Sequence, residues 1–119
     1  MHRSVSFEDV PVVDDVVVAR LLTLRDQVAK QGEDVLGELL GLFERDTSVR
    51  VASLRTSLNN AEERRNAAHA LKGSAGNVGA ARVAAMAAWI EKNAIVDDDI
   101  DRLERAVAAA LVALRARLG

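Results

Sequence analysis

The sequence predicts an all-α fold, an antiparallel four-helix bundle with one or two additional helices at its N-terminal end. Apolar residues recur at helical spacing through most of the 119-residue chain, aromatic residues make up only 3%, and Pro11 is the only proline. Alanine and leucine favour closely packed helices, whereas sheets prefer aromatic and β-branched residues. A chain of this length forms one domain with a single core.

Residues 1–13 contain Pro11 and no sustained helical pattern, so we expect a partly ordered lead-in, followed by one helical domain over 14–119. Asp14 or Asp15 is a good N-cap for a first helix, which ends by Gly32. Valines over 12–18 favour a strand by propensity, but no second strand exists to pair with it. The apolar side chains expected to point inward are Val17, Val18, Leu21, Leu24 and Val28.

A second helix is expected to open at Glu33-Asp34 and to carry a long apolar stripe. Polar residues at 46–48 interrupt this stripe, and we expect a break or bend there. Asn59-Asn60 is typical of a turn. The stripe consists of Val35, Leu36, Leu39, Leu40 and Phe43, and then of Val51, Leu54 and Leu58.

Three further elements complete the expected bundle. Glu62-Glu63 places negative charge at the start of a third helix, which ends at Gly79, where a left-handed residue is favourable. A fourth helix covers about 80–93, and Asp97-Asp98-Asp99 is expected to cap a last helix over 100–118. Together with Asp101, this acidic group lacks the ligand spacing of a calcium loop, so we expect no metal there.

Composition excludes several classes of function. A net charge of −2 and a pI near 5.7 are far from the basic footprint of nucleic-acid binding. The absence of cysteine removes disulfides and thiolate metal sites, and it fits a reducing compartment. Apolar runs are too short for a membrane span or a signal peptide, so a cytoplasmic protein is expected. No glycine-rich nucleotide-binding motif occurs.

The most informative segment is 67–79, where His69, Lys72 and Gly73 stand at i, i+3 and i+4. On a helix these three residues share one surface, and periodicity places them on the polar face. Glycine inside a helix costs about 1 kcal/mol relative to alanine, which suggests that a bulky group must approach the ring beside it. A neutral imidazole is nucleophilic near pH 7, so His69 is a candidate for carrying a group.

Residues 39–93 resemble the histidine-containing phosphotransfer (HPt) domain of two-component phosphorelays. The motif A-H-x-L-K-G-S-x-x-x-x-G is present over 68–79, and the match extends through Leu40-Gly41-Leu42-Phe43, Ala80-Ala81-Arg82-Val83 and Ile90-Glu91. The departures are Val78 and Ile90, where leucine is more usual, and Asn59-Asn60 in place of a Gly-Asp turn.

This resemblance implies that His69 accepts a phosphoryl group on Nε2 while Glu91 hydrogen-bonds Nδ1–H. It implies that the phosphoryl group comes from a receiver aspartate or from a hybrid sensor histidine kinase. His69 would then pass the group to a second receiver. The chain would then be a monomeric, stoichiometric phosphocarrier and no enzyme, with no cofactor of its own and with Mg²⁺ in the receiver. Lys72 could offset the phosphoryl charge, Gly73 could leave room for the receiver, and Ser74 could help to order the site.

Two other functions are compatible with a helical bundle. A non-phosphorylated adaptor for receivers or kinases would keep the same docking face, and only His69, Lys72 and Gly73 argue against it. The phosphoacceptor domain of a sensor kinase has an acidic residue after its histidine, whereas Ala70 follows here. Both the phosphocarrier and the adaptor would bind a receiver through the surface around His69. This docking surface is polar at Asn66 and Lys72, and we expect it to have an apolar edge. That edge would be formed by Val17, Val18 or Leu21.

Overall fold

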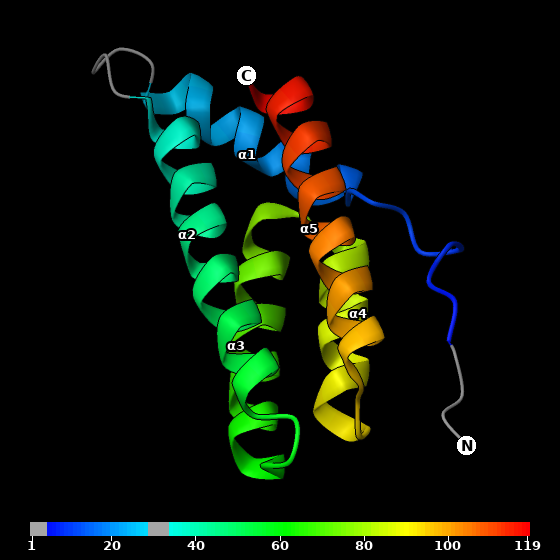
Figure 1. The fold of residues 1–119 in the computed structure, drawn as a ribbon. Helices are drawn as coiled ribbons and strands as arrows, with labels where there is room; N and C mark the ends of the chain where they lie inside the picture. Colours follow the sequence, from blue (N-terminus) through cyan, green and yellow to red (C-terminus); the bar gives the residue numbers. More distant parts are fainter. Residues whose placement is uncertain (1–4, 29–33) are drawn as a thin grey trace.

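The computed structural model describes residues 5–28 and 34–119, which form five helices and no strand. They are α1 (Asp15–Val28), α2 (Val35–Thr56), α3 (Ala61–Val78), α4 (Ala81–Lys92) and α5 (Asp97–Leu118). Figure 1 shows α2 to α5 packed side by side as a bundle, with α1 lying across one end. The prediction of an all-α four-helix bundle with an additional N-terminal helix is therefore confirmed.

Small residues bring α3 and α4 close together in the core. Ala68 and Ala75 of α3 and Ala87 of α4 are fully buried, so the two backbones approach without large side chains between them. Branched residues fill the wider space toward the other helices, and burying each such side chain stabilises the fold by about 1.5–3 kcal/mol. The fully buried branched side chains include Leu54, Leu71, Val83, Ile100, Leu103 and Leu114.

Helix α2 is continuous, so the predicted break at 46–48 is wrong. Thr47 is buried, but its hydroxyl donates hydrogen bonds to the carbonyl oxygens of Phe43 (2.8 Å) and Glu44 (2.9 Å) of the same helix. A threonine satisfied by the preceding turn can occupy a core position without interrupting the helix. The Asp46 side chain points toward α3 and accepts a hydrogen bond from Ser74 of that helix.

Polar side chains cap the first three helices as their sequences suggest. Asp14 accepts from Val16 N at 2.9 Å, Asp34 accepts from Gly37 N at 2.9 Å, and Asn60 accepts from Glu63 N at 3.1 Å. The last helix differs from expectation because it begins at Asp97, three residues early. The acidic residues therefore occupy its first turn, where Asp99 accepts a hydrogen bond from Val96 N at 2.9 Å.

The inward face of α1 is rotated relative to the prediction. Val18 and Leu21 are buried against the bundle, but Leu24 is 39% exposed, so its predicted inward orientation is wrong. The burial of Val18 and Leu21 also removes them as the exposed apolar edge expected near His69, whereas Val17, the third candidate, is partly buried. Because α1 crosses the end of the bundle, only one side of it packs on the other helices, and residues such as Val16 and Leu24 are exposed.

Residues 5–14 pack against the outer side of α4 and α5. Asp14 N donates to Gly79 O at 2.8 Å, and Arg82 of α4 donates to the carbonyl oxygen of Val10 at 2.9 Å. Phe7 packs edge-on against Trp89, with ring centroids 6.5 Å apart. This segment therefore has a defined place on the bundle, although it contains no helix or strand.

Candidate functional site

The helix α3 separates its residues into a buried face and an exposed face, as the periodicity predicts. Ala68 and Leu71 are fully buried, whereas the His69 side chain is 76% exposed. The flanking residues of α3 are held in the core, so the ring stands on a rigid helix at the surface of the bundle. Such an imidazole is open to a group carried by another protein.

His69 is held by a carboxylate from the neighbouring helix. Nδ1 of His69 lies 2.9 Å from Oε1 of Glu91, and the Glu91 side chain is only 16% exposed. An ionised carboxylate can only accept a hydrogen bond, so when the ring is neutral its proton lies on Nδ1. The Nε2 lone pair then remains free at the exposed edge of the imidazole.

Lys72 binds the same carboxylate as His69. Its Nζ donates to Oε2 of Glu91 at 3.2 Å and lies 3.1 Å from Oε1. These hydrogen bonds to Lys72, and then the one to His69, lower the pKa of Glu91 below its usual value, against the opposing effect of burial. Glu91 is thus kept ionised, and the sequence-predicted residues His69, Lys72 and Glu91 form one connected group.

The two glycines that follow Lys72 on the exposed face have open space beside them. A Cβ atom added to Gly73 or to Gly76 would meet no atom within 4 Å outside its own helix. Close packing between helices therefore does not require glycine at either position. Gly73 lies one turn after His69, so its missing side chain keeps the approach to the ring open.

Ser74 makes a contact that its sequence position did not reveal. Its hydroxyl donates a hydrogen bond to Oδ2 of Asp46 on α2. Beside this pair, a cavity of about 310 Å³ lies between α2 and α3, and Leu42 at its rim is 58% exposed. Sequence reasoning missed Asp46 because a polar residue in an apolar stripe looked like a helix break, and only the packing of α2 on α3 joins the two residues.

Metal-ligating side chains are not clustered in the part of the chain that the structure describes. No group of three or more histidine, cysteine, aspartate or glutamate side chains converges anywhere within 5–28 and 34–119. In the same ranges no helix is long and apolar enough to cross a bilayer.

A helical bundle that presents one exposed imidazole, oriented by a carboxylate and flanked by a lysine and a glycine, defines a phosphohistidine carrier. The chain belongs to the Hpt domain family, whose model matches residues 38–117. Its function is histidine phosphotransfer in a phosphorelay.

A solved structure supports this assignment. The fold is similar to the crystal structure of histidine-containing phosphotransfer protein B (HptB) from Pseudomonas aeruginosa PAO1, with a TM-score of 0.74 and 26% sequence identity. The similarity covers 91% of this chain and 95% of that one. No curated protein sequence matches the chain significantly.

Proposed function

We propose that His69 is the phosphoacceptor and that Nε2 is the reacting atom. The observation that supports this proposal is the 2.9 Å hydrogen bond between Nδ1 of His69 and Glu91, because it favours the neutral tautomer in which Nε2 carries no proton. The Nε2 lone pair attacks the phosphorus of an aspartyl phosphate in a receiver domain. A P–N bond forms as the P–O bond to the aspartyl carboxylate breaks, and the carboxylate leaves with the bonding electrons.

Glu91 acts as a positioning residue in this transfer. The ring gains positive charge as Nε2 bonds to phosphorus, and an ionised carboxylate at Nδ1–H stabilises that charge. The lowered pKa of Glu91 keeps it ionised near neutral pH. Because the proton stays on Nδ1, the reverse transfer to a second receiver regenerates the same neutral tautomer.

Lys72 has two roles in the proposed cycle. Before transfer, its Nζ at 3.1–3.2 Å from the Glu91 oxygens holds the carboxylate in place. After transfer, the phosphoryl group adds about −1.5 to −2 charges beside His69, and an ammonium group one turn away offsets them. Gly73 leaves the space through which the receiver's acidic pocket reaches the ring.

The partners that fit this site are receiver domains and the receiver portion of a hybrid sensor histidine kinase. The receiver supplies the aspartate and the Mg²⁺, so the chain acts as a stoichiometric carrier with no cofactor of its own and not as an enzyme. We propose that the apolar edge of the docking surface lies at Leu42 of α2, beside the Ser74–Asp46 pair, in place of the buried Val18 and Leu21 of α1. A monomer in the cytoplasm is consistent with this role.

Transfer of radiolabel tests the proposal. The chain is incubated with phosphorylated receivers from the same genome, and the label on it should be acid-labile and base-stable. His69→Gln should abolish the label while circular dichroism shows an unchanged helical signal, and His2→Gln, which removes the only other histidine, should retain it. Label that persists in His69→Gln would place the acceptor elsewhere, and receiver binding without any label would favour the adaptor.

A further inference from the structure

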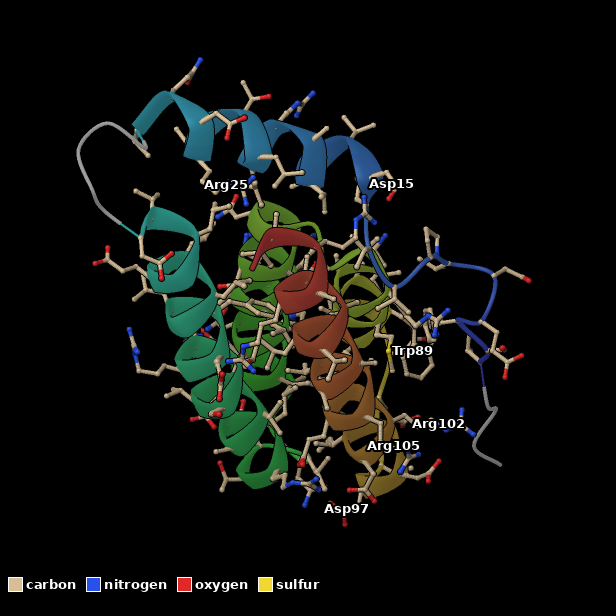
Figure 2. All side chains as sticks on the ribbon, turned by 90° about the horizontal axis from the view of Figure 1, so that it is seen from above. Asp15, Arg25, Trp89, Asp97, Arg102 and Arg105 are labelled. Carbon is tan, nitrogen blue, oxygen red and sulfur yellow. The ribbon has the colours of Figure 1, made fainter. Side chains whose placement is uncertain are left out.

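A second polar site lies between the N-terminal segment, α4 and α5, away from the residues proposed for phosphotransfer. Here a cavity of about 530 Å³ is lined by three arginines, Arg82, Arg102 and Arg105, which we call the arginine cavity. Phe7 and Met86 contribute apolar walls. Figure 2 shows Arg102 and Arg105 on the side of the bundle that carries the N-terminal segment and Trp89.

Two of the three arginines hold the N-terminal segment by its backbone. Arg82 donates to the carbonyl oxygens of Val10 at 2.9 Å and Glu8 at 3.2 Å, and Arg102 donates to the carbonyl oxygen of Val5 at 3.4 Å. Arg102 also pairs with Asp98 at 3.1 Å. Carbonyl oxygens satisfy hydrogen bonds but carry no net charge, so the positive charge of Arg82 is not neutralised by these contacts.

The guanidinium group of Arg105 has no polar partner among the described residues. It is exposed, and within 5–28 and 34–119 it makes no hydrogen bond or ion pair. Among the described residues that line this cavity, Glu8 is the acidic one, and its side chain pairs with no described arginine, while Asp98 outside the lining is engaged by Arg102. Positive charge is therefore in excess at this cavity, although the whole chain carries a net charge of −2.

The chemistry of the lining points to a phosphorylated ligand. Guanidinium groups bind phosphate oxygens through paired, charge-assisted hydrogen bonds, and the cavity volume lies in the range of small-molecule sites. We propose that the arginine cavity binds a phosphorylated small molecule of nucleotide size. Its phosphates would contact Arg105 and Arg82, and its apolar part would contact Phe7 and Met86. The walls come from three separate segments, which favours a compact ligand over an extended acidic peptide.

Trp89 provides a built-in reporter for this binding. It is the only tryptophan of the chain, and it packs edge-on against Phe7 at the wall of the cavity. The full chain is titrated with ADP, GDP and pyrophosphate at physiological ionic strength, and Trp89 fluorescence is followed in parallel with calorimetry. We expect saturable binding of a nucleotide that is tighter than binding of pyrophosphate.

Arg105→Ala should weaken nucleotide binding about tenfold or more, because a charge-assisted hydrogen bond is lost. Arg65→Ala, which removes an exposed arginine of α3 outside the cavity, should bind as the wild type does. Circular dichroism confirms that both variants fold. The proposal is overturned if none of the three probes binds, if Arg105→Ala binds as tightly as the wild type, or if pyrophosphate binds as tightly as the nucleotides. Binding of an Asp/Glu-rich peptide in place of nucleotides would reassign the cavity to a protein partner.

Discussion

His69 and Glu91 are 22 residues apart in sequence and lie on different helices, yet Nδ1 of His69 is 2.9 Å from Oε1 of Glu91. The connection between α3 and α4 consists only of Gly79 and Ala80, so the two helices pack as an antiparallel hairpin. The buried alanines Ala68 and Ala87 let the backbones approach closely. The orientation of the imidazole is thus determined by the packing of the bundle.

Removing the carboxylate of Glu91 should lower the population of the His69 tautomer that carries its proton on Nδ1, which the proposed phosphotransfer requires. In Glu91→Ala we expect the rate of phosphoryl transfer to His69 to fall about 10–100-fold, as for other partners that orient a histidine through its second nitrogen. Nitrogen-15 NMR of the ring should show Nε2–H tautomer that is absent from the wild type. In Glu91→Gln the amide oxygen can still accept a hydrogen bond from Nδ1–H. Its transfer rate should therefore lie between those of the wild type and Glu91→Ala.

A matched control separates orientation from net charge. Glu62→Ala removes an exposed carboxylate from the first turn of the same helix that carries His69. Its transfer rate should equal that of the wild type. An equal loss of rate in both variants would refute the orienting role of Glu91.

Lys72→Ala should raise the pKa of Glu91 toward its usual value, because the hydrogen bond from Lys72 is the largest cause of the lowered pKa. The carboxyl ¹³C signal of Glu91, followed through an acid titration, measures this change directly. Lys92→Ala removes the lysine next to Glu91 in sequence, which makes no hydrogen bond or ion pair with any described residue, and should leave the titration unchanged.

The hydrogen bonds of Glu91 should also make stability depend on pH in a defined direction. Since its pKa is lower in the folded state, the unfolded chain takes up the proton first as the pH falls. The stabilising effect of Glu91 is therefore fully present above its ordinary pKa of 4.5 and is lost as the pH falls through the lowered value. Urea unfolding of wild type and Glu91→Gln should show a free-energy difference that is constant above about pH 5 and shrinks below it. A difference that grows on acidification would contradict the assignment.

Gly73→Leu should slow phosphotransfer without damaging the fold. The space beside Gly73 is open, so leucine is accommodated in the free protein, and helix propensity alone should stabilise it by about 0.5–1 kcal/mol. In a complex with a receiver the same side chain occupies the approach to His69. Gly76→Leu, which lies a further turn along, should give a similar gain in unfolding free energy and a smaller loss of rate. Normal transfer by Gly73→Leu would disprove the access role.

Gly79→Ala should destabilise the bundle, in contrast to Gly73→Leu. Gly79 has φ of 80°, and an added Cβ would lie 3.1 Å from Cβ of Val17 and 3.3 Å from the carbonyl oxygen of Asp14. The left-handed conformation alone costs a non-glycine residue about 1–2 kcal/mol. Thermal unfolding should show a lowered Tm, whereas Gly76→Ala, in the open part of α3, should not lower it.

Much of this architecture could be predicted from local signals in the sequence. Gly79 was predicted to end a helix because glycine is favoured there, and the structure confirms the left-handed turn. The exposed placement of His69 followed from the apolar period of α3. Its contact with Glu91 lies between two helices, and only the resemblance to a known family indicated it.

The features that sequence reasoning missed depend on hydrogen bonds and on helix packing, which a hydropathy pattern does not contain. The buried Thr47 looked like a helix break because its hydrogen bonds to the preceding turn are invisible in a hydropathy pattern. Leu24 has the correct period for burial, but α1 crosses the end of the bundle and leaves this side chain partly exposed. The Ser74–Asp46 hydrogen bond joins α3 to α2, and neither residue signals its partner locally.

The two-residue connection at Gly79-Ala80 has a consequence for evolution and engineering. The residues proposed for the transfer step itself, His69, Lys72, Gly73 and Glu91, lie inside one continuous helical hairpin, while residues 5–28 and α5 lie outside it. We therefore expect fusion of further domains at either end to leave this hairpin intact. A module of this design can be joined to a kinase or exchanged between signalling proteins without rebuilding its chemistry.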